Sequence, residues 1–313
     1  MIININDKYK IKVKKKFKTN LKIIKEEYVL TSYINKYFLK ESIYTKSGFG
    51  DISNIIDNNE NEYIVKIQKE KIKKQNYILK EYKIYCELEG CGYISKYYDY
   101  FQYQELRCLV LIKFDIDLKK LFYKDRVFYL TKRMSFYVTI FGILEDIHKR
   151  KIIHGDIKFS NIMYNYKEDK IYLIDFGCSK KWENVTEKRI SGTLRYASIN
   201  AHLGNSINNH NDIESLLYSI LEIEIYPKSL LWKGYYKKND TTIKKWNRIY
   251  KLKKAYLSLY DKPMNMAYLF KYYNFEKEIN KEKEINKEKE INKEEIDYNE
   301  YIKIIIRDMY KMY

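Results

Sequence analysis

Two short stretches of the chain combine acids, a lysine and an amide at a spacing that suits chemistry. The first runs from His154 to Asn161, and the second begins fourteen residues later at Asp175. Asp156 can accept the proton of an incoming hydroxyl, and Lys158, on the same side of an extended segment, can neutralise a phosphoryl group in transit. Asn161 and Asp175 offer hard oxygen ligands, which suit Mg²⁺. These residues predict magnesium-assisted phosphoryl transfer.

Together the two stretches read H-x-D-x-K-x-x-N followed by D-F-G, a pattern typical of protein kinases. Either stretch alone could be an ordinary turn or strand end, but their order and spacing make that alternative the weaker one. The pattern predicts an α+β, two-lobed protein kinase fold, with a small β-rich N-lobe that has one helix and a larger, mostly helical C-lobe. We expect a basic N-terminal extension over residues 1–37, the N-lobe over 38–114 and the C-lobe over 115–313.

The elements expected to bind ATP lie before these motifs. Ser47, Gly48 and Gly50 stand where a glycine loop would cover the nucleotide, and Ile52 follows them on a candidate strand. Lys66 lies on the next candidate strand, where its charge could hold the α- and β-phosphates, although a solvent-facing lysine is the alternative.

Partners for these residues come from the next two elements. Glu81 lies on a predicted helix over roughly 70–88 and is our choice to pair with Lys66, ahead of the nearby Glu87 and Glu89. The apolar run 109–112 predicts a buried strand that leads to the hinge. Ile64, Leu111 and Lys113 complete the expected nucleotide contacts.

A long amphipathic helix is expected to deliver the chain to the catalytic loop. Its apolar residues return at intervals of three and four. They are Phe136, Ile140, Phe141, Ile143, Leu144 and Ile147. A later helix contains residues 212–217, and a last one resumes at about Tyr298, with Tyr301, Ile304, Ile305 and Met309 on one face.

Three further passages make the chain resemble the casein kinase I group. Residues 79–85 resemble the short αC helix of the group, residues 192–204 its activation-segment end with Ser-Ile-Asn in place of Ala-Pro-Glu, and residues 212–216 its central large-lobe helix. The resemblance covers about 44–274 and 297–310. Gly155 is also found in the vaccinia-related and poxviral branch, whereas the sequence Arg-Tyr-Ala-Ser at 195–198 is closer to casein kinase I itself, so the branch stays open.

The resemblance implies a serine/threonine kinase that uses ATP and Mg²⁺ and acts on acidic or already phosphorylated proteins. By its position, Arg195 would hold an anion beside the active site, as a guanidinium fork can. By a looser alignment, Lys233, Lys237 and Lys238 would add to that surface. Thr193 would position the acceptor beside Asp156 and Lys158. Asp212 would brace the catalytic loop from below.

The chain departs from the family pattern at several places. Thr45 and Ser47 replace the first two glycines of the loop, where Cβ atoms hinder close approach to phosphate. Ile64 replaces a small alanine and narrows the adenine pocket. Gly155 replaces the arginine that reads a phosphorylated activation loop in many kinases, which predicts activity without activating phosphorylation.

Composition fits a globular protein with unusual charge. The 313 residues are 45% hydrophobic and 33% charged, with a net charge of +18. Such an excess points to nucleic acid, acidic or phosphorylated protein, or a membrane surface as partners, with a merely lysine-rich solvated surface as the alternative. We expect protein substrates, and nucleic acid only as an accessory partner.

The sequence also supports predictions about the redox state of the cysteines, membrane association and cellular location. Four cysteines show no metal or disulfide spacing, so we expect buried, reduced thiols. No apolar run approaches the ~20 residues that span a bilayer, and the first twenty residues hold no signal-peptide core. We therefore expect an intracellular protein of the cytoplasm or nucleus, and a monomer.

Two segments fall outside the kinase pattern. Alternating lysines and apolar residues over 8–14 predict an edge strand, and the lysine cluster over 14–18 could be a nuclear-localisation or nucleic-acid patch. On the charge pattern we favour a solvated extension. The sequence Glu-Lys-Glu-Ile-Asn-Lys occurs three times from Glu276 on, and it places like charges four residues apart, which disfavours a helix. We expect residues 276–296 to be a low-complexity insertion.

Two other classes of function compete with catalysis. A pseudokinase scaffold would explain Thr45, Ser47 and Ile64, but a drifting scaffold could lose any of the six chemistry-bearing residues, and all are present. They are Lys66, Glu81, Asp156, Lys158, Asn161 and Asp175. A basic nucleic-acid-binding protein would need aromatic platforms in a recognised module, and the sequence contains none.

Overall fold

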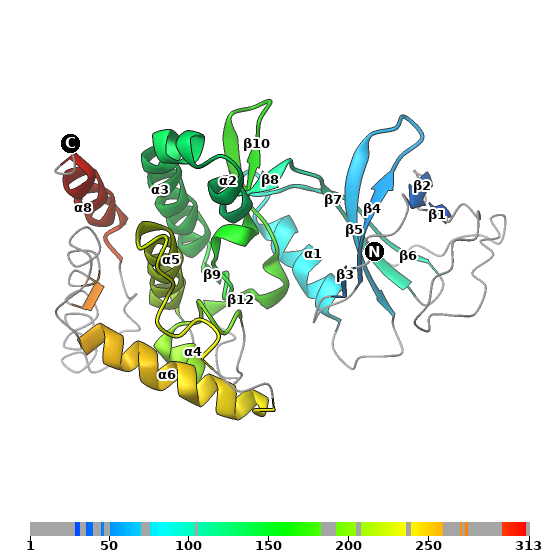
Figure 1. Ribbon diagram of the computed structural model, residues 1–313. Coiled ribbons are helices and arrows are strands. Elements are labelled where there is room, and N and C mark those ends of the chain that lie inside the picture. The colour runs from blue at the N-terminus through cyan, green and yellow to red at the C-terminus, as the bar shows by residue number, and fades with distance from the viewer. Residues whose placement is uncertain are drawn as a thin grey trace, which may run out of the picture. The chain divides into compact units, whose positions relative to one another are not determined.

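The computed structural model describes residues 29–31, 36–39, 45–46, 51–69, 76–103, 106–182, 192–204, 208–235, 239–258, 270, 273–274 and 296–310. They divide into two compact units (Figure 1). The first unit contains the described residues up to Gly90 together with 95–114, and the second contains 91–94 and the described residues from Asp115 onward. The first is an antiparallel sheet with a helix and the second is mostly helical, so the predicted α+β class is confirmed.

The sheet of the first unit has the order β1-β2-β4-β5-β7-β6, and β3 pairs with β4. Every pairing in it is antiparallel. The strands are β1 (Val29–Thr31), β2 (Lys36–Leu39), β3 (Thr45–Lys46), β4 (Asp51–Ile56), β5 (Glu62–Lys69), β6 (Tyr97–Tyr103) and β7 (Leu106–Ile112).

One face of this sheet forms the core of the unit, and it starts earlier in the chain than the sequence indicates. Tyr63, Val65 and Ile67 alternate along β5 and belong to one buried cluster, as a period of two requires. Tyr37 is fully buried in the same cluster, and its ring stacks on Phe101 at 6.0 Å. The sheet therefore begins before residue 38. Its first two strands are only three and four residues long, too short to show a period of two in the sequence, and they are held by pairing and by Tyr37.

Helix α1 (Tyr77–Glu87) packs on the sheet through a buried side that includes Ile78 and Glu81. The backbone N–H of Ile78 donates to the side chain of Gln68 on β5 at 3.1 Å, which fixes the start of the helix against that strand. The predicted helix over 70–88 is thus present over its second part, and residues 70–75 lie outside the described range.

The second unit is built mainly from helices, with short strands beside them (Figure 1). The helices are α2 (Leu118–Lys124), α3 (Arg126–Lys149), η2 (Phe159–Asn161), η3 (Phe176–Cys178), α4 (Ile199–Leu203), α5 (Asn209–Glu224), α6 (Thr242–Ser258) and α8 (Tyr298–Tyr310). The strands are β8 (Ile116–Asp117), β9 (Ile152–Ile153), β10 (Ile162–Asn165), β11 (Lys170–Leu173) and β12 (Lys180–Lys181). They form one sheet in the order β11-β10-β8 and a separate pair, β12 with β9.

Helix α3 is the long amphipathic helix that the sequence predicts, and its six predicted apolar residues are buried. Asp125 caps it by accepting the backbone N–H of Phe128 at 3.0 Å. Helix α8 lies against it, with the ring of Tyr301 stacked on Phe141 at 5.3 Å. By length and mean hydropathy (1.2) α3 alone among the described helices could span a membrane, but a core helix of a globular domain meets the same criteria.

Helix α5 is the central element of the second unit. Fifteen of its residues, from Asn209 to Ile223, are buried, and the polar ones among them therefore need partners inside the protein. Asn208 and Asn211 form a capping box that fixes its first turn. The site described below depends on two acids of this helix, Asp212 and Glu222.

Two further sequence predictions concern the cysteines and the segments outside the kinase pattern. All four cysteines are free thiols, but only Cys91 and Cys108 are buried, so the expectation of burial is wrong for Cys86 and Cys178. Partial burial still raises the pKa of Cys178 to about 12, which keeps it protonated. The predicted strand over 8–14 and the repeats over 276–295 lie outside the described residues.

Candidate active site

The loop from His154 to Lys158 is held from below by one carboxylate. Asp212 on α5 accepts the backbone N–H of His154 at 2.7 Å and that of Gly155 at 2.9 Å. His148, at the end of α3, contacts the same carboxylate through Nε2 at 3.0 Å and the hydroxyl of Tyr298 on α8 through Nδ1. Asp212 therefore holds the backbone of the catalytic loop. Through this carboxylate the loop is linked to three helices, α5, α3 and α8.

Glycine is needed at two positions, one in the loop and one in the segment that approaches it. Gly155 has φ +77°, a left-handed conformation that side chains rarely adopt. Gly192, on the segment that follows the Asp-Phe-Gly motif, has φ +88°, and a Cβ there would lie 2.7 Å from the Gly155 carbonyl oxygen. The close approach brings Thr193 to the loop.

Asp156, Lys158 and Thr193 form a closed set of hydrogen bonds. Lys158 Nζ donates to Asp156 Oδ2 and to Thr193 Oγ1, each at 2.7 Å. The backbone N–H of Thr193 donates to Asp156 Oδ1, also at 2.7 Å. The structure thus brings together a carboxylate, an ammonium group and a hydroxyl, all three expected at the point of transfer.

A hairpin brings the backbone directly before Asp175 beside Asn161. Strands β10 and β11 pair antiparallel with Ile162 opposite Leu173, so the residues just outside the pair lie side by side. The N–H of Ile174 donates to the Asn161 carbonyl oxygen at 3.0 Å. Asp175 follows in a left-handed conformation, φ +68°, which a non-glycine residue adopts only when its surroundings impose it.

The donor set at this hairpin suits a hard cation that also has ligands from elsewhere. Asn161 Nδ2 donates to the Asp156 carbonyl oxygen at 2.9 Å, so its amide oxygen faces the other way and can bind a cation. Among the described residues no cluster of three or more His, Cys, Asp or Glu side chains could hold a metal. One carboxylate and one amide match Mg²⁺, which keeps waters and phosphate oxygens as its other ligands.

In the first unit, the predicted partners Lys66 and Glu81 form a buried ion pair. Lys66 Nζ lies 2.6 Å from Glu81 Oε1, with the two side chains 11% and 1% exposed. The pair joins β5 to α1. Because both charges are removed from water, the contact fixes the direction of the lysine far more firmly than a surface pair could.

Three of the predicted nucleotide contacts share a face of the sheet with Lys66. Ile52 on β4 lies opposite Lys66, and Ile64 lies opposite Leu111 on β7. Directly opposed residues of antiparallel strands project to the same side, and this side is the one away from the Tyr63 cluster. The larger side chain at 64 therefore adds bulk to that surface.

Four more residues are predicted to contact the nucleotide: Lys113, Ser47, Gly48 and Gly50. Lys113 donates to Glu62 at 2.7 Å on the surface of the unit. Ser47, Gly48 and Gly50 lie outside the described residues, so their predicted role stays a prediction.

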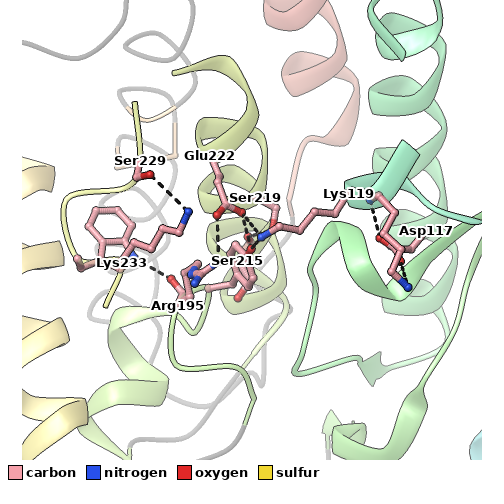
Figure 2. A network of polar contacts seen from close by, with 11 residues as sticks. Asp117, Lys119, Arg195, Ser215, Ser219, Glu222, Ser229 and Lys233 are labelled. Atoms are coloured by element: carbon pink, nitrogen blue, oxygen red, sulfur yellow. Dashed lines mark hydrogen bonds and ion pairs between the residues drawn. The ribbon is translucent and has the colours of Figure 1, made fainter. Parts of the chain in front are cut away.

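Arg195 lines one pocket together with Lys158 and Thr193, and it has an unexpected partner. Its Nη1 lies 3.1 Å from Oε1 of Glu222 on α5. Lys119 of α2 lies 2.8 Å from Oε2 of the same acid, and the Tyr196 hydroxyl donates to it at 2.5 Å (Figure 2). Sequence reasoning missed Glu222 and Lys119; a lone acid in the apolar run 220–223 was the available signal for a buried ion pair.

The chain matches the model of the protein kinase domain over residues 46–309. It belongs to the protein kinase family. Among curated proteins, this kinase is similar to a probable casein kinase I homolog of Encephalitozoon cuniculi, 34% identical over 199 residues, which are 60% of this chain and 61% of the relative. A probable serine/threonine-protein kinase of fowlpox virus is 30% identical over 145 residues, 44% of this chain and 47% of the viral protein.

Human serine/threonine-protein kinase VRK2 is 30% identical over 131 residues, 39% of this chain and 26% of the human protein. The matched part of the kinase thus spans less than two thirds of these relatives. Their names confirm the resemblance to the casein kinase I group and include both of the branches that the motifs left open.

Proposed function

We propose that the protein is an active serine/threonine kinase that transfers the γ-phosphoryl group of ATP to protein hydroxyls. The observation that carries this proposal is the set of contacts at 2.7 Å among Asp156, Lys158 and Thr193. A scaffold has no need for a carboxylate and an ammonium group held together beside a hydroxyl at this loop. Family membership supports the same reaction class.

Each residue then has one task. Asp156 orients the acceptor hydroxyl and takes its proton, and Lys158 neutralises charge on the group in transit. Lys66, directed by Glu81, binds the α- and β-phosphates of the nucleotide. The oxygens of Asn161 and Asp175 hold Mg²⁺, which supplies charge neutralisation on the phosphates when bound. Most of the catalysis comes from positioning and electrostatics.

The proposed substrates are acidic or already phosphorylated proteins. Arg195, Lys119 and Lys233 line a pocket that also includes Lys158 and Thr193, so a negative side chain near the acceptor would meet positive charge. The net charge of +18 acts in the same direction at longer range. We also propose that the protein acts inside the cell, in the cytoplasm or nucleus, and that it is a monomer.

A second candidate function is a catalytically weak scaffold. It draws support from Ile64, whose bulk lies on the same face of the sheet as Lys66, and from the two missing glycines in the sequence. Nucleotide binding separates the candidates, because a scaffold that has lost its adenine pocket would bind ATP weakly or not at all.

The test is phosphate transfer from labelled ATP with Mg²⁺ to casein, with the natural protein compared with Asp156→Asn. We expect incorporation by the natural protein and a loss of at least about 10²-fold in the variant, the usual contribution of a general base. Asp146→Asn, an exposed acid on α3, is the matched control and should keep full activity. Equal incorporation by the natural protein and Asp156→Asn would contradict the assignment, and no incorporation by either would favour the scaffold.

A further inference from the structure

A pocket of about 330 Å³ within the second unit adjoins the proposed acceptor site. Lys158 and Thr193 belong both to its wall and to the hydrogen-bonded set around Asp156. A side chain near the acceptor residue of a peptide can therefore reach it. Three more cationic residues lie in the described part of its wall: Lys119, Arg195 and Lys233.

Behind this wall lies a buried acid, Glu222. Its side chain is 5% exposed and lies 2.8 Å from Lys119 and 3.1 Å from Arg195. Figure 2 shows Lys119 and Arg195 on either side of this carboxylate. Trp232 donates its indole N–H to the Arg195 carbonyl oxygen at 2.8 Å and is itself buried, so the backbone at Arg195 is anchored beside the acid.

Glu222 is charged in this setting. Burial alone would raise the pKa of Glu222, but hydrogen bonds from Lys119 and Tyr196 and the positive charges of Lys119 and Arg195 hold it below its usual value. The acid therefore cancels one of the two positive charges that it contacts.

The remaining cations of the pocket differ in how much they offer a ligand. Lys158 is already compensated by Asp156. Lys233 is exposed and makes a long hydrogen bond of 3.4 Å to Ser229, so water screens its charge. Among the described residues, the pocket has four cationic side chains, and Glu222 and Asp156 together leave an excess of two positive charges. One of these is the screened charge of Lys233.

We propose that Glu222 is a specificity-determining residue that narrows the preference of this pocket for a phosphorylated side chain over a singly charged acidic one, Asp or Glu. The proposal rests on the proposed kinase function, because it assigns the pocket to a residue next to the acceptor. A phosphate carries nearly two negative charges, so fixed negative charge behind the wall repels it about twice as strongly as a carboxylate. Arg195 also cannot offer its whole fork to phosphate while one arm contacts Glu222.

The test measures binding, so that it does not depend on catalysis. Fluorescent serine peptides carry Ala, Glu or phosphoserine at one position, placed in turn at each of the three residues before and after the acceptor, and anisotropy without nucleotide gives each Kd. At the position that uses the pocket, the natural protein should bind the phosphoserine peptide less than about tenfold more tightly than the Glu peptide. Glu222→Gln should strengthen phosphoserine binding about tenfold and Glu binding about threefold, because the free-energy gain scales with ligand charge.

Glu224→Gln is the matched control. Glu224 lies on the same helix, pairs with Arg133 at 3.5 Å and is equally sheltered, so its variant should leave all peptide affinities unchanged. A natural protein that binds phosphoserine peptides more than tenfold tighter than Glu peptides overturns the proposal, as does an equal gain for both in Glu222→Gln, or no difference from Ala at any position. If Glu222→Gln does not fold, the ratio measured for the natural protein decides alone. Failure of casein phosphorylation with these affinities as expected would count against the kinase function only.

Discussion

Replacing Asp212 by Asn should loosen the catalytic loop while leaving the volume of the side chain unchanged. The carboxylate is buried, and Oδ2 accepts the N–H of His154 while Oδ1 accepts the N–H of Gly155. An amide has one oxygen and one NH₂ group. Whichever way it turns, one loop N–H faces a donor in place of an acceptor.

The size of the effect follows from these contacts. The variant loses one hydrogen bond to a charged acceptor, worth about 1.5–3 kcal/mol, and leaves one buried N–H unsatisfied, which costs about 1–3 kcal/mol. Because the two terms share a group, we expect a loss of about 3–5 kcal/mol in the free energy of unfolding. Turnover should fall as well, since the displaced peptide unit lies directly before Asp156.

The assay is denaturant unfolding followed by tryptophan fluorescence. All three tryptophans, Trp182, Trp232 and Trp246, belong to the second unit, so the signal reports the unit that contains Asp212. Asp125→Asn is the control, because this exposed helix cap keeps its acceptor as asparagine and should change stability by less than about 0.5 kcal/mol. A loss below about 1 kcal/mol for Asp212→Asn would refute the reasoning.

Two other predictions concern different parts of the chain. Glu81→Gln removes one charge of a buried ion pair and should lower the free energy of unfolding of the first unit by about 3 kcal/mol. It should also lower kcat/KM for ATP at least about tenfold, measured by steady-state kinetics. An unchanged kcat/KM would mean that Lys66 needs no such partner. Burial, helped by the positive charge of Lys253, lowers the pKa of His202 to about 3. The unfolded chain then takes up the proton more readily, so stability should fall by about 2 kcal/mol between pH 7 and pH 5. His202→Asn should flatten that slope, and an equally steep slope in the variant would count against it.

Much of the site could be predicted because its chemistry restricts residue type and spacing. Asp156 and Lys158 are two residues apart on one loop, and a hairpin of fixed length returns Asp175 to Asn161, so local sequence defines their geometry. The period of three and four over residues 136–147 likewise predicts α3, because a helix that buries one face must repeat in that way.

What the sequence could not predict depends on contacts between distant segments. The pairing of Glu222 with Lys119 joins positions 103 residues apart, and neither residue has a local pattern that identifies its partner. The first strands of the sheet were missed for a related reason: β1 and β2 are three and four residues long, and the ring of Tyr37 packs on distant residues, Phe101 and Tyr63. Tertiary contacts can override weak local preference in short strands.

Helix α5 carries both the residue that braces the catalytic loop and the residue that adjusts the neighbouring pocket. Asp212 and Glu222 are ten residues apart, which a straight helix converts to about 15 Å. Substitutions at that separation usually act additively. During evolution, substitutions at Glu222 can therefore change substrate preference without impairing phosphoryl transfer. Related kinases can then differ in their targets while they share the same catalytic loop.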